Sequence, residues 1–306
     1  MHNNQNVKAA KVKSKKQSQF KEIWRRFKKN KTAMVGLGII LLLILVSIFA
    51  DIIAPPIVDE LSGLTIESWE HQDLKKENNF PSGEHWFGTD NFGRDIFARV
   101  VHGSRISIQV GIVVVGIASV LGVTLGAIAG FYGGIYDNVL MRIIDIVLAI
   151  PNILLATAIA AALGPGLLNV MIAIGIGTIP SYARIVRGSV LTLKDQEYLE
   201  AARSIGASDF RLIIKHILPN CMAPIIITAT MGMANAILSA AALSFIGLGV
   251  KPPTPEWGAM LNAGRRYMRD FWPIVLFPGA AIAFVVLGFN MLGDGLRDAL
   301  DPRLKR

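Results

Sequence analysis

Residues 32–50 read TAMVGLGIILLLILVSIFA, a run of 19 residues without a charged side chain. A hydrocarbon core about 30 Å thick requires about 20 predominantly apolar residues from a helix that crosses it. The run therefore predicts a membrane-spanning helix. It is too long for the apolar part of a cleavable signal peptide, and the following DIIAPP offers no convincing small-residue cleavage site, so we expect a retained first span.

Five further apolar runs follow, and the overall composition agrees with them. The chain has 306 residues, of which 52% are hydrophobic and 17% charged, which is too apolar for a soluble domain of this length. Strand barrels also span membranes, but their strands alternate in hydropathy instead of forming solid runs. We predict an all-α membrane protein with six transmembrane helices, the later five within residues 106–130, 146–163, 166–183, 221–250 and 271–293.

Basic residues flank these runs unevenly, which predicts the orientation of the chain. Residues 1–31 contain eleven Lys or Arg and one acid, and such density keeps its side of a membrane in the cytoplasm. Six crossings then place both termini in the cytoplasm, residues 55–103 outside and residues 184–220 inside. Three basic residues on the predicted outside do not follow this bias: Arg265, Arg266 and Arg269. The membrane surface accounts for the net charge of +9, so we expect no nucleic-acid partner.

The same boundaries divide the chain into parts. Residues 1–31 are expected to be a basic tail, disordered over the first 19 residues and ending in an interfacial helix, FKEIWRRFKK, with Phe20, Ile23, Trp24 and Phe27 at helical spacing. The first transmembrane helix covers 32–54, the outside segment 55–103, a five-helix core 104–296 and a second cytoplasmic tail 297–306. Cys221 is the single cysteine, so no intrachain disulfide is possible.

A polar stretch interrupts the apolar runs between the fourth and fifth predicted spans. Residues 200–219 read EAARSIGASDFRLIIKHILP. Good helix formers precede Gly206, Ser208 is a favoured cap for a second helix, and Pro219 is expected to end that helix. The stretch predicts a helix, a turn and a helix. One face of the second helix, expected to lie on another surface, carries Phe210, Ile213, Ile214 and Ile217.

The residues alone leave two interpretations of this stretch open. The small side chains of Ala201 and Ala202 allow another surface to approach closely, and Gly206 permits a sharp change of direction. Such a compact knob, on the cytoplasmic side, would transmit movement from a soluble partner to the membrane helices. The alternative is an amphipathic connector that rests on lipid headgroups.

A second polar motif, GTDNFGRD, precedes the second predicted span at residues 88–95. Asp90 and Asp95 lie close in sequence to Arg94 and Arg99. The motif therefore predicts an ion-pair network that holds the outside segment together, with direct contact to solute as the alternative.

One feature within the second predicted span concerns packing, and one near an inner helix end concerns charge. Gly122, Gly126 and Gly130 recur every four residues, and such ladders let helix backbones approach closely in lipid. We therefore expect this ladder to serve bundle packing. Arg142 and Asp145, at i and i+3, are expected to form a local ion pair and not a proton relay.

Together these motifs resemble the C-type permease subunits of dipeptide and oligopeptide ABC importers, in the peptide/nickel family. The resemblance rests first on the EAA loop: Glu200-Ala201-Ala202, three residues, Gly206, a ten-residue gap and Ile217-Leu218-Pro219, between the fourth and fifth of six spans. It rests also on GTDNFGRD with residues 99–107, on MRIIDIVLAIP at 141–151 and on LSFIGLGVKPPTPEWGAML at 243–261. It covers nearly everything from residue 32 onward.

The resemblance implies the type I ABC importer permease fold in a bacterial cell membrane. It implies three kinds of partner besides the lipid bilayer: an extracytoplasmic solute-binding protein, a homologous second permease subunit and two ATP-binding subunits. ATP and Mg²⁺ would bind to those subunits, with no cofactor in this chain. The implied function is ATP-driven import of dipeptides or oligopeptides by alternating access. Within the loop at 188–220, coupling to the ATPases would fall to Glu200, Ala201, Ala202 and Gly206, and the outer-face motif would comprise Gly88, Thr89, Asp90, Gly93, Arg94 and Asp95.

Other functions receive less support from the sequence. The chain contains no Gly-Lys dipeptide and so no Walker A loop, and its five histidines show no metal-ligand spacing, so we expect no enzyme. A self-sufficient transporter or channel would carry charged residues deep in its spans, whereas these spans are nearly free of charge at their centres. A membrane scaffold that only docks soluble partners is a third alternative.

Overall fold

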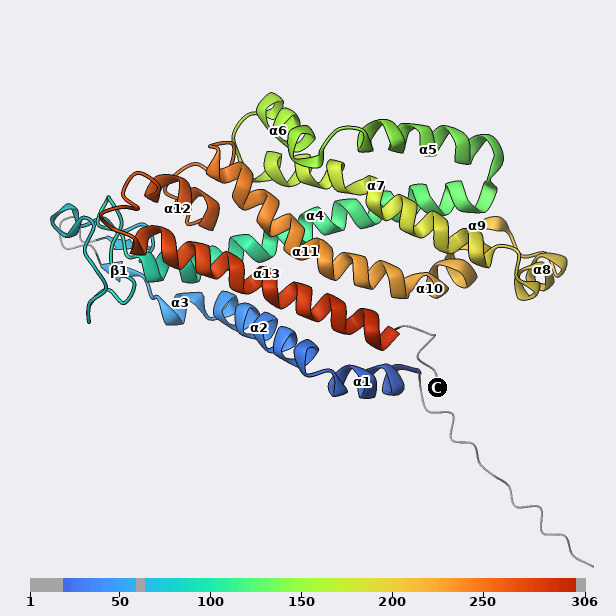
Figure 1. Cartoon of the computed structure of the whole chain (residues 1–306), viewed down its shortest axis with the longest axis horizontal. Helices are drawn as coiled ribbons and strands as arrows, with labels where there is room; N and C mark the ends of the chain where they lie inside the picture. Colours follow the sequence, from blue (N-terminus) through green and yellow to red (C-terminus); the bar gives the residue numbers. More distant parts are fainter. Residues whose placement is uncertain (1–18, 59–63, 301–306) are drawn as a thin grey trace, which may run out of the picture.

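The computed structural model describes residues 19–58 and 64–300 and shows long helices that run side by side (Figure 1). Among the described residues, five helices are long and apolar enough to cross a membrane: α2 (Lys31–Ile48), α4 (Ile96–Tyr132), α7 (Leu167–Leu193), α11 (Met222–Phe245) and α13 (Pro273–Leu300). A sixth crossing results if α5 (Gly134–Leu148) and α6 (Asn152–Leu163), which are bent by 86° at their junction, form one broken span.

The third predicted span, over residues 146–163, is wrong as a single helix. α5 ends at Leu148, and α6 begins at Asn152 after a break. Pro151 causes the break, because proline lacks a backbone N–H and disfavours helical geometry in the residue before it. Its own backbone is extended, with ψ of 129°, and its carbonyl accepts the first hydrogen bonds of α6, from Leu154 and Leu155.

The second span begins earlier than the hydropathy pattern predicts, at Ile96 and not at residue 106. Asp95 starts the helix, since its Oδ1 accepts a hydrogen bond from the backbone N–H of Ala98 at 2.8 Å. The first turns carry Arg99 and His102, which are each 4% exposed. The first turns of α4 are thus polar in sequence, and their polar side chains are buried inside the protein. The hydropathy pattern could not predict this part of the helix for that reason.

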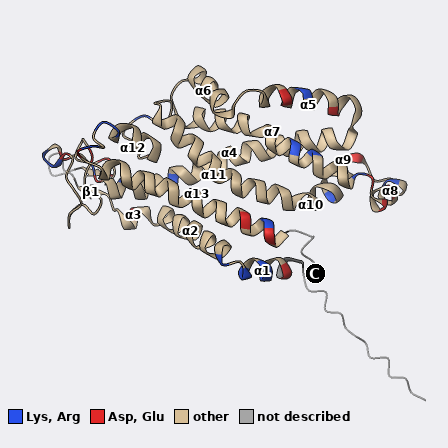
Figure 2. Cartoon of the chain, viewed as in Figure 1, with Lys and Arg blue, Asp and Glu red and all other residues tan. Residues whose placement is uncertain are grey.

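Short elements close the bundle at two ends, which we call the β1 end and the α8 end (Figure 1). The β1 end holds α3 (Ala50–Ile53), the antiparallel pair β1 (Ile57–Val58) and β2 (Thr65–Ile66), the 3-10 turn η1 (Leu74–Lys76) and α12 (Trp257–Gly264); Ile57 lies opposite Ile66. The α8 end holds α1 (Gln19–Lys29), α8 (Glu197–Ser204), α9 (Asp209–Leu212), the π-helical turn η2 (Ile213–Ile217) and α10 (Leu218–Asn220). Figure 2 shows that most charged residues lie toward these ends.

Buried apolar side chains connect the helices along their length. One cluster joins α2, α11, α12 and α13 and includes Trp257, which is 2% exposed. A second cluster joins α4, α6, α7 and α11. α11 contributes to both clusters and so packs against helices on two of its sides.

The predicted interfacial helix before the first span is present as α1. Its Phe27 is 3% exposed and packs in one cluster with residues of α2 and α13, whereas Trp24 stays 41% exposed. Asn30 joins three helices: its Oδ1 accepts from the backbone N–H of Ala33 at 3.1 Å, and its Nδ2 donates to Oδ2 of Asp298 at 3.0 Å. α1 is thus fixed to the end of α13.

Three further predictions concern the ends of the chain. The expected disorder of residues 1–19 falls, apart from Gln19 in α1, outside the described residues, and so does the side chain of Phe20. The predicted second tail at 297–306 begins too early, because α13 remains helical to Leu300. Its residues 301–306 are outside the described part of the chain.

The glycine ladder of α4 lies against α7, which confirms its predicted packing role. A Cβ on Gly122 would lie 2.5 Å from Cβ of Tyr182, and a Cβ on Gly126 would lie 2.4 Å from the carbonyl oxygen of Ala183. A Cβ on Gly130 would lie 2.8 Å from Cβ of Val190, also in α7. Real Cβ atoms do not approach other atoms so closely, so each of these positions accepts only glycine without a shift of α7. We call this contact the α4–α7 seam.

We predict that Gly126→Val lowers the stability of the purified protein by about 1–3 kcal/mol, because overpacking forces α4 and α7 apart. The control is Gly116→Val on the same helix, where an added Cβ meets nothing within 4 Å. Thermal unfolding in detergent measures both variants. Equal midpoints for the two variants would contradict the role of the seam.

Candidate coupling site and loop network

The segment that connects α7 to α11 forms the α8 end of the molecule. Its α8 lies beyond the ends of the long helices, farthest from β1 (Figure 1). The helix, turn and second helix predicted for residues 200–219 are confirmed as α8, a turn at residues 205–208, and α9. We call residues 197–220 the α8–α10 segment.

Gly206 ends α8 through the backbone geometry that its position requires. Its φ is +84°, in the left-handed region where glycine carries no steric penalty. Its N–H donates to the carbonyl of Arg203 at 3.0 Å, and the N–H of Ala207 donates to the carbonyl of Ala202 at 3.1 Å. These two bonds form a Schellman motif, and Ala202 and Ala207 both pack against the same apolar cluster. The motif turns the chain sharply at this point.

The second helix starts as predicted but does not end as predicted. Oγ of Ser208 accepts from the backbone N–H of Arg211 at 3.4 Å and so caps α9. Pro219, predicted to stop the helix, lies inside α10, and the backbone continues into α11. The π-helical turn η2 precedes it, in which the N–H of Leu218 reaches back to the carbonyl of Ile213. This turn accommodates the proline and leaves the helical path unbroken.

The buried face of the segment differs from the predicted face. Ile217 is buried and Ile213 half-buried, but Phe210 and Ile214 are 75% and 46% exposed, and Leu212 is buried in their place. The prediction assumed 3.6 residues per turn, whereas α9 is one short turn followed by a wider π-helical turn. We call the buried anchor the base; it packs in one cluster with residues of α4 and α7 and comprises Leu199, Leu212, Ile217 and Cys221.

The part of the segment that faces away from the base is exposed to solvent, whereas the base is buried. Ile205 is 87% exposed and Phe210 75% exposed, although both are large apolar side chains. Nothing lies within 4 Å of a Cβ added at Gly206. Glu200 and Ala201 are exposed, and Ala202 is half-buried. We call the exposed residues Glu200, Ala201, Ile205, Gly206 and Phe210 the tip.

At the β1 end, the glycines of the GTDNFGRD motif permit a tightly folded loop. Gly88 and Gly93 have φ of +79° and +69°. A Cβ on Gly88 would lie 2.3 Å from the carbonyl oxygen of Asn79, and one on Gly93 would collide with the backbone of Asp73. At both positions the backbone is left-handed and another segment of the loop lies very close, so both positions require glycine.

Asp90 is the centre of the polar contacts in this loop. Its Oδ1 accepts from the backbone N–H groups of Phe92 and Arg94, at 2.8 and 3.0 Å, and its Oδ2 accepts from Nε of Arg94 at 2.7 Å. Asp90, Arg94 and Arg99 are buried, at 4–5% exposure, and Nε of Arg99 lies 3.8 Å from Asp90 Oδ2. The predicted ion-pair network is therefore present, with these three residues as its members.

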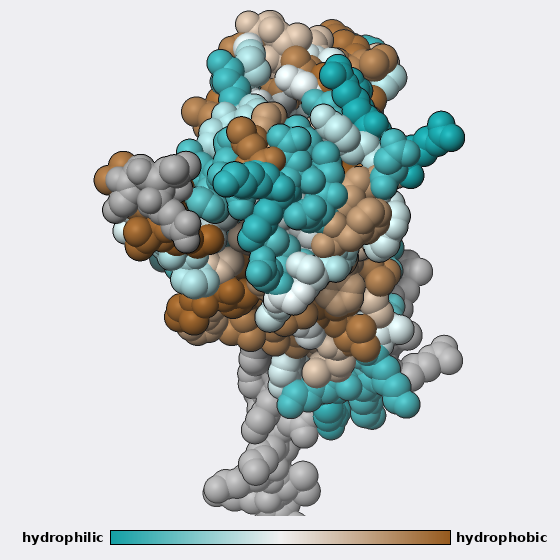
Figure 3. Space-filling view, turned by 90° about the vertical axis from the view of Figure 1, so that its left-hand side faces the viewer, coloured by the Kyte–Doolittle hydropathy of each residue, from teal (hydrophilic) through white to brown (hydrophobic). Residues whose placement is uncertain are grey.

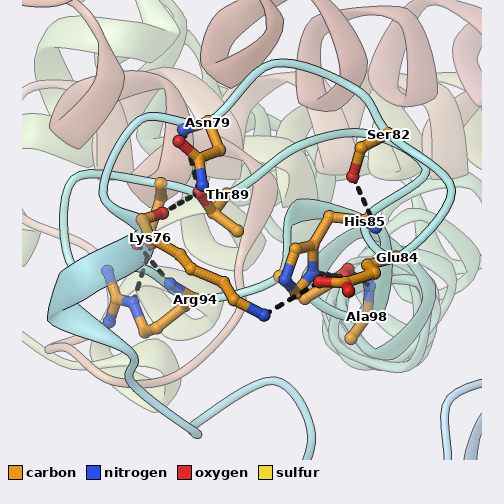
Figure 4. Close-up of polar contacts among 10 residues, drawn as sticks. Lys76, Asn79, Ser82, Glu84, His85, Thr89, Arg94 and Ala98 are labelled. Carbon is orange, nitrogen blue, oxygen red and sulfur yellow. Dashed lines mark hydrogen bonds and ion pairs between the residues drawn. The ribbon is translucent and has the colours of Figure 1, made fainter.

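Asp95 and Thr89 bind other partners, and Figure 4 shows Thr89 beside Asn79 and Lys76. Oδ2 of Asp95 accepts from Nδ1 of His85 at 2.7 Å, so this aspartate pairs with a histidine and not with the predicted arginines. Oγ1 of Thr89 accepts from the backbone N–H of Asn79 at 3.0 Å and donates to the carbonyl of Lys76. All six residues of the predicted outer-face motif thus contribute to the internal structure of the loop.

The start of α4, directly after the loop, is also joined to α12 and to the segment before it, across a long sequence separation. Nη1 of Arg99 donates to the carbonyls of Trp69 and Pro253, at 2.9 and 3.0 Å. Nε1 of Trp257 donates to the carbonyl of Val100 at 3.0 Å. Figure 3, which looks onto this end of the molecule, shows a largely hydrophilic surface with hydrophobic patches at its border.

Glu256 is a structural residue that the sequence analysis missed. Its carboxylate is 4% exposed and caps α12, accepting from the backbone N–H groups of Gly258 and Ala259 at 2.9 and 2.7 Å. Burial raises the pKa of Glu256 above its usual value, against the opposite effect of the two hydrogen bonds. An acidic residue directly before a helix was the sequence signal for this cap.

The predicted pair of Arg142 with Asp145 is wrong. Oδ1 of Asp145 accepts instead from Nη2 of Arg184 at 2.6 Å, and Asp137 accepts two bonds from Arg187, at 2.5 and 2.6 Å. Both arginines belong to α7, so these ion pairs hold α5 against α7. The spacing within α5 could not reveal partners 39 and 50 residues away.

We predict that Asp90→Asn destabilises the protein by about 3 kcal/mol or more, because it leaves Arg94 buried without its carboxylate. The control, Glu84→Gln, removes an ion pair with Lys76 in which the glutamate side chain is 75% exposed, and it should leave stability near that of the parent. Thermal unfolding in detergent compares them. A similar midpoint for both variants would show that burial of the network is unimportant.

Two family models match the chain. Residues 122–306 match the binding-protein-dependent transport system inner membrane component, and residues 18–75 match the N-terminal TM domain of oligopeptide transport permease C. The first match includes the whole α8–α10 segment.

Two relatives resemble the chain over almost its full length. The dipeptide transport system permease protein DppC of Alkalihalophilus pseudofirmus is 50% identical over 288 residues, which cover 94% of this chain and 91% of the relative. The glutathione transport system permease protein GsiD of Escherichia coli is 48% identical over 284 residues, covering 93% and 90%.

A solved structure shares the fold. A chain from inward-facing conformations of the MetNI methionine ABC transporter superposes with a TM-score of 0.55 at 19% identity, covering 67% of this chain and 98% of that chain. At this identity the likeness concerns the fold alone.

Proposed function

The chain belongs to the family of binding-protein-dependent transport system inner membrane components, and from this premise we propose that it forms half of the translocation path of an ATP-driven peptide importer. The proposal is carried by one observation: the chain is 50% identical, over 94% of its length, to a protein named as a dipeptide transport permease. A glutathione permease at 48% identity supports the same class of substrate, since glutathione is itself a small peptide.

The remaining partners follow from the separate subunits of which such importers consist. ATP and Mg²⁺ bind to two separate ATPase subunits, since this chain contains no Gly-Lys dipeptide and hence no Walker A loop. A homologous second permease subunit completes the path. A solute-binding protein delivers the peptide at the β1 end.

The tip of the α8–α10 segment is the proposed docking site for an ATPase subunit. Ile205 and Phe210 are large, apolar and largely exposed, and burial of such a side chain contributes about 1.5–3 kcal/mol. Ala201 and Gly206 offer no bulk, so a partner surface can approach the backbone between these anchors. Glu200 adds a charge at the rim of this contact. The alternative of a connector on lipid headgroups gives no reason for the sharp turn at Gly206.

The base explains how docking would move the membrane helices. Leu199, Leu212 and Ile217 are 0–4% exposed and belong to the same buried cluster as residues of α4 and α7. Close-packed interiors transmit displacement because they deform little. A shift of the tip by a nucleotide-dependent movement of the ATPase therefore displaces the ends of α4 and α7. Alternating access of the path follows from that displacement.

We predict that vesicles containing the complete importer take up peptide only with ATP and the binding protein. Two variants of the tip, Phe210→Ser and Gly206→Val, should each reduce uptake and co-purification of the ATPase by about tenfold or more. Loss of about 1.4 kcal/mol of docking free energy corresponds to a tenfold loss of affinity. Gly206→Val acts by placing a β-branched residue at positive φ. Leu74→Ser, at an apolar residue of the β1 end that is 64% exposed, is the matched control and should bind the ATPase as the parent does.

Each other outcome of this experiment selects a different function. Uptake without the ATPase would indicate a channel or secondary transporter. Absence of uptake with every subunit bound would indicate a scaffold. Variants that retain their ATPase and their uptake would refute the assignment of the tip.

The proposed orientation places the α8 end in the cytoplasm and the β1 end outside, in a bacterial cell membrane. We predict that Ser208→Cys reacts with a membrane-impermeant thiol reagent only in inverted vesicles, whereas Gly83→Cys reacts in intact cells. Cys221 is fully buried and should not react in either preparation. Labelling of Ser208→Cys in intact cells would reverse the orientation.

A further inference from the structure

Three potential ligands converge at the β1 end from separate parts of the chain. Asp51 belongs to α3, Glu67 follows β2, and His102 lies in the first turns of α4. The nearest ligand atoms of these residues all lie within 4.8 Å of one another. None of the three belongs to the loop network around Asp90 or to the tip.

The orientation of the His102 ring is determined by its hydrogen bond. The side chain is buried, and Nε2 lies 3.1 Å from the carbonyl oxygen of Ala54. A carbonyl oxygen only accepts, so Nε2 carries the hydrogen and the neutral ring has its lone pair on Nδ1. Nδ1 lies 3.9 Å from Oδ1 of Asp51, which is too long for a hydrogen bond. Among the described residues no hydrogen bond to Nδ1 is formed, so its lone pair stays available beside the carboxylate of Asp51.

We propose that Asp51, Glu67 and His102 bind a divalent transition-metal ion of the zinc class. Zinc binds histidine nitrogen and carboxylate oxygen at about 2.0–2.2 Å, so ligands of one ion lie about 3–4 Å apart. The observed separations need only a small adjustment to meet this requirement. Glu67 lies at the surface and can make this adjustment, whereas Asp51 is exposed but held by Arg105. Water would complete the coordination.

The hydrogen bond from His102 to Ala54 is itself typical of a metal ligand. Histidines that bind metals commonly donate their second ring N–H to a backbone carbonyl or carboxylate, which fixes the tautomer and the ring orientation. The carbonyl of Ala54 is held in turn, because it also accepts from Oγ of Ser68 at 2.8 Å. The supporting contact is thus present before any ion binds.

Arg105 limits which ions the site accepts. It donates to both carboxylate oxygens of Asp51, at 2.7 and 2.9 Å, and these bonds hold the pKa of Asp51 below its usual value. A carboxylate has about four lone-pair positions, so each oxygen of Asp51 keeps one for a metal. With neutral His102, the two carboxylates and one guanidinium leave a net charge of −1. This small negative charge disfavours the binding of Mg²⁺ and Ca²⁺ at the site, whereas the imidazole ligand favours the binding of Zn²⁺, Ni²⁺ or Cu²⁺.

The test uses the purified full-length chain in detergent, without a histidine tag and stripped of metal. Titration with Zn²⁺ alone should show one ion bound per chain. Glu67→Gln should weaken binding by about tenfold or more, since even loss of a supporting residue costs metal sites 10–100-fold. Because Glu67 is exposed, this variant should fold as the parent does. His102→Gln should have the larger effect, and His216→Gln, at the α8 end, is the matched control.

A fluorescence measurement locates the ion. The ring of Trp69 lies 6.4 Å from the ring of His102, so bound Cu²⁺ or Ni²⁺ should quench the emission of Trp69. Trp69→Phe should remove the quenched component and leave binding of Zn²⁺ unchanged. Absence of stoichiometric binding, or binding that Glu67→Gln and His102→Gln leave unaltered, would overturn the proposal. Neither result depends on transport, so the proposed function is tested separately.

Discussion

Close packing of α4 against α7 is the contact on which the rest of the molecule depends. The backbones approach until a Cβ at Gly126 would lie 2.4 Å from a carbonyl oxygen of α7. In a bilayer, apolar bulk gains little by leaving equally apolar lipid, so contact between backbones supplies the attraction between helices. Two other parts of the protein are built on this pair: α5 is held to α7 by two ion pairs, and the base of the α8–α10 segment packs on both helices.

The two ends of the bundle use polar residues differently. At the β1 end, Asp90, Arg94 and Arg99 are buried and make their bonds to one another and to backbone N–H and carbonyl groups, so their charges serve structure. At the α8 end the buried residues are apolar, and exposed apolar residues occupy the tip. A loop held by buried ion pairs at one end and an exposed apolar tip at the other suit the proposal that this permease meets a binding protein and an ATPase on opposite sides.

The proposed metal site and the loop network lie at the same end but have different character. Asp90 has every oxygen engaged by close donors. Nδ1 of His102, by contrast, lies 3.9 Å from Oδ1 of Asp51 and has no hydrogen bond of its own. An ion at this site would join α3, the segment after β2 and α4, and would so strengthen the contact between the first and second long helices.

The sequence by itself determined the features that depend on neighbouring residues. Charge-free runs predicted the long helices, the spacing around Gly206 predicted a helix, turn and helix, and the ladder at Gly122, Gly126 and Gly130 predicted close packing. Only the tertiary structure decided which residues meet across the chain. It paired Asp145 with Arg184, exposed Phe210 through a π-helical turn, and brought His102 to Asp51. Local patterns report backbone preference and hydropathy, whereas these contacts depend on how helices far apart in sequence pack, which no local pattern contains.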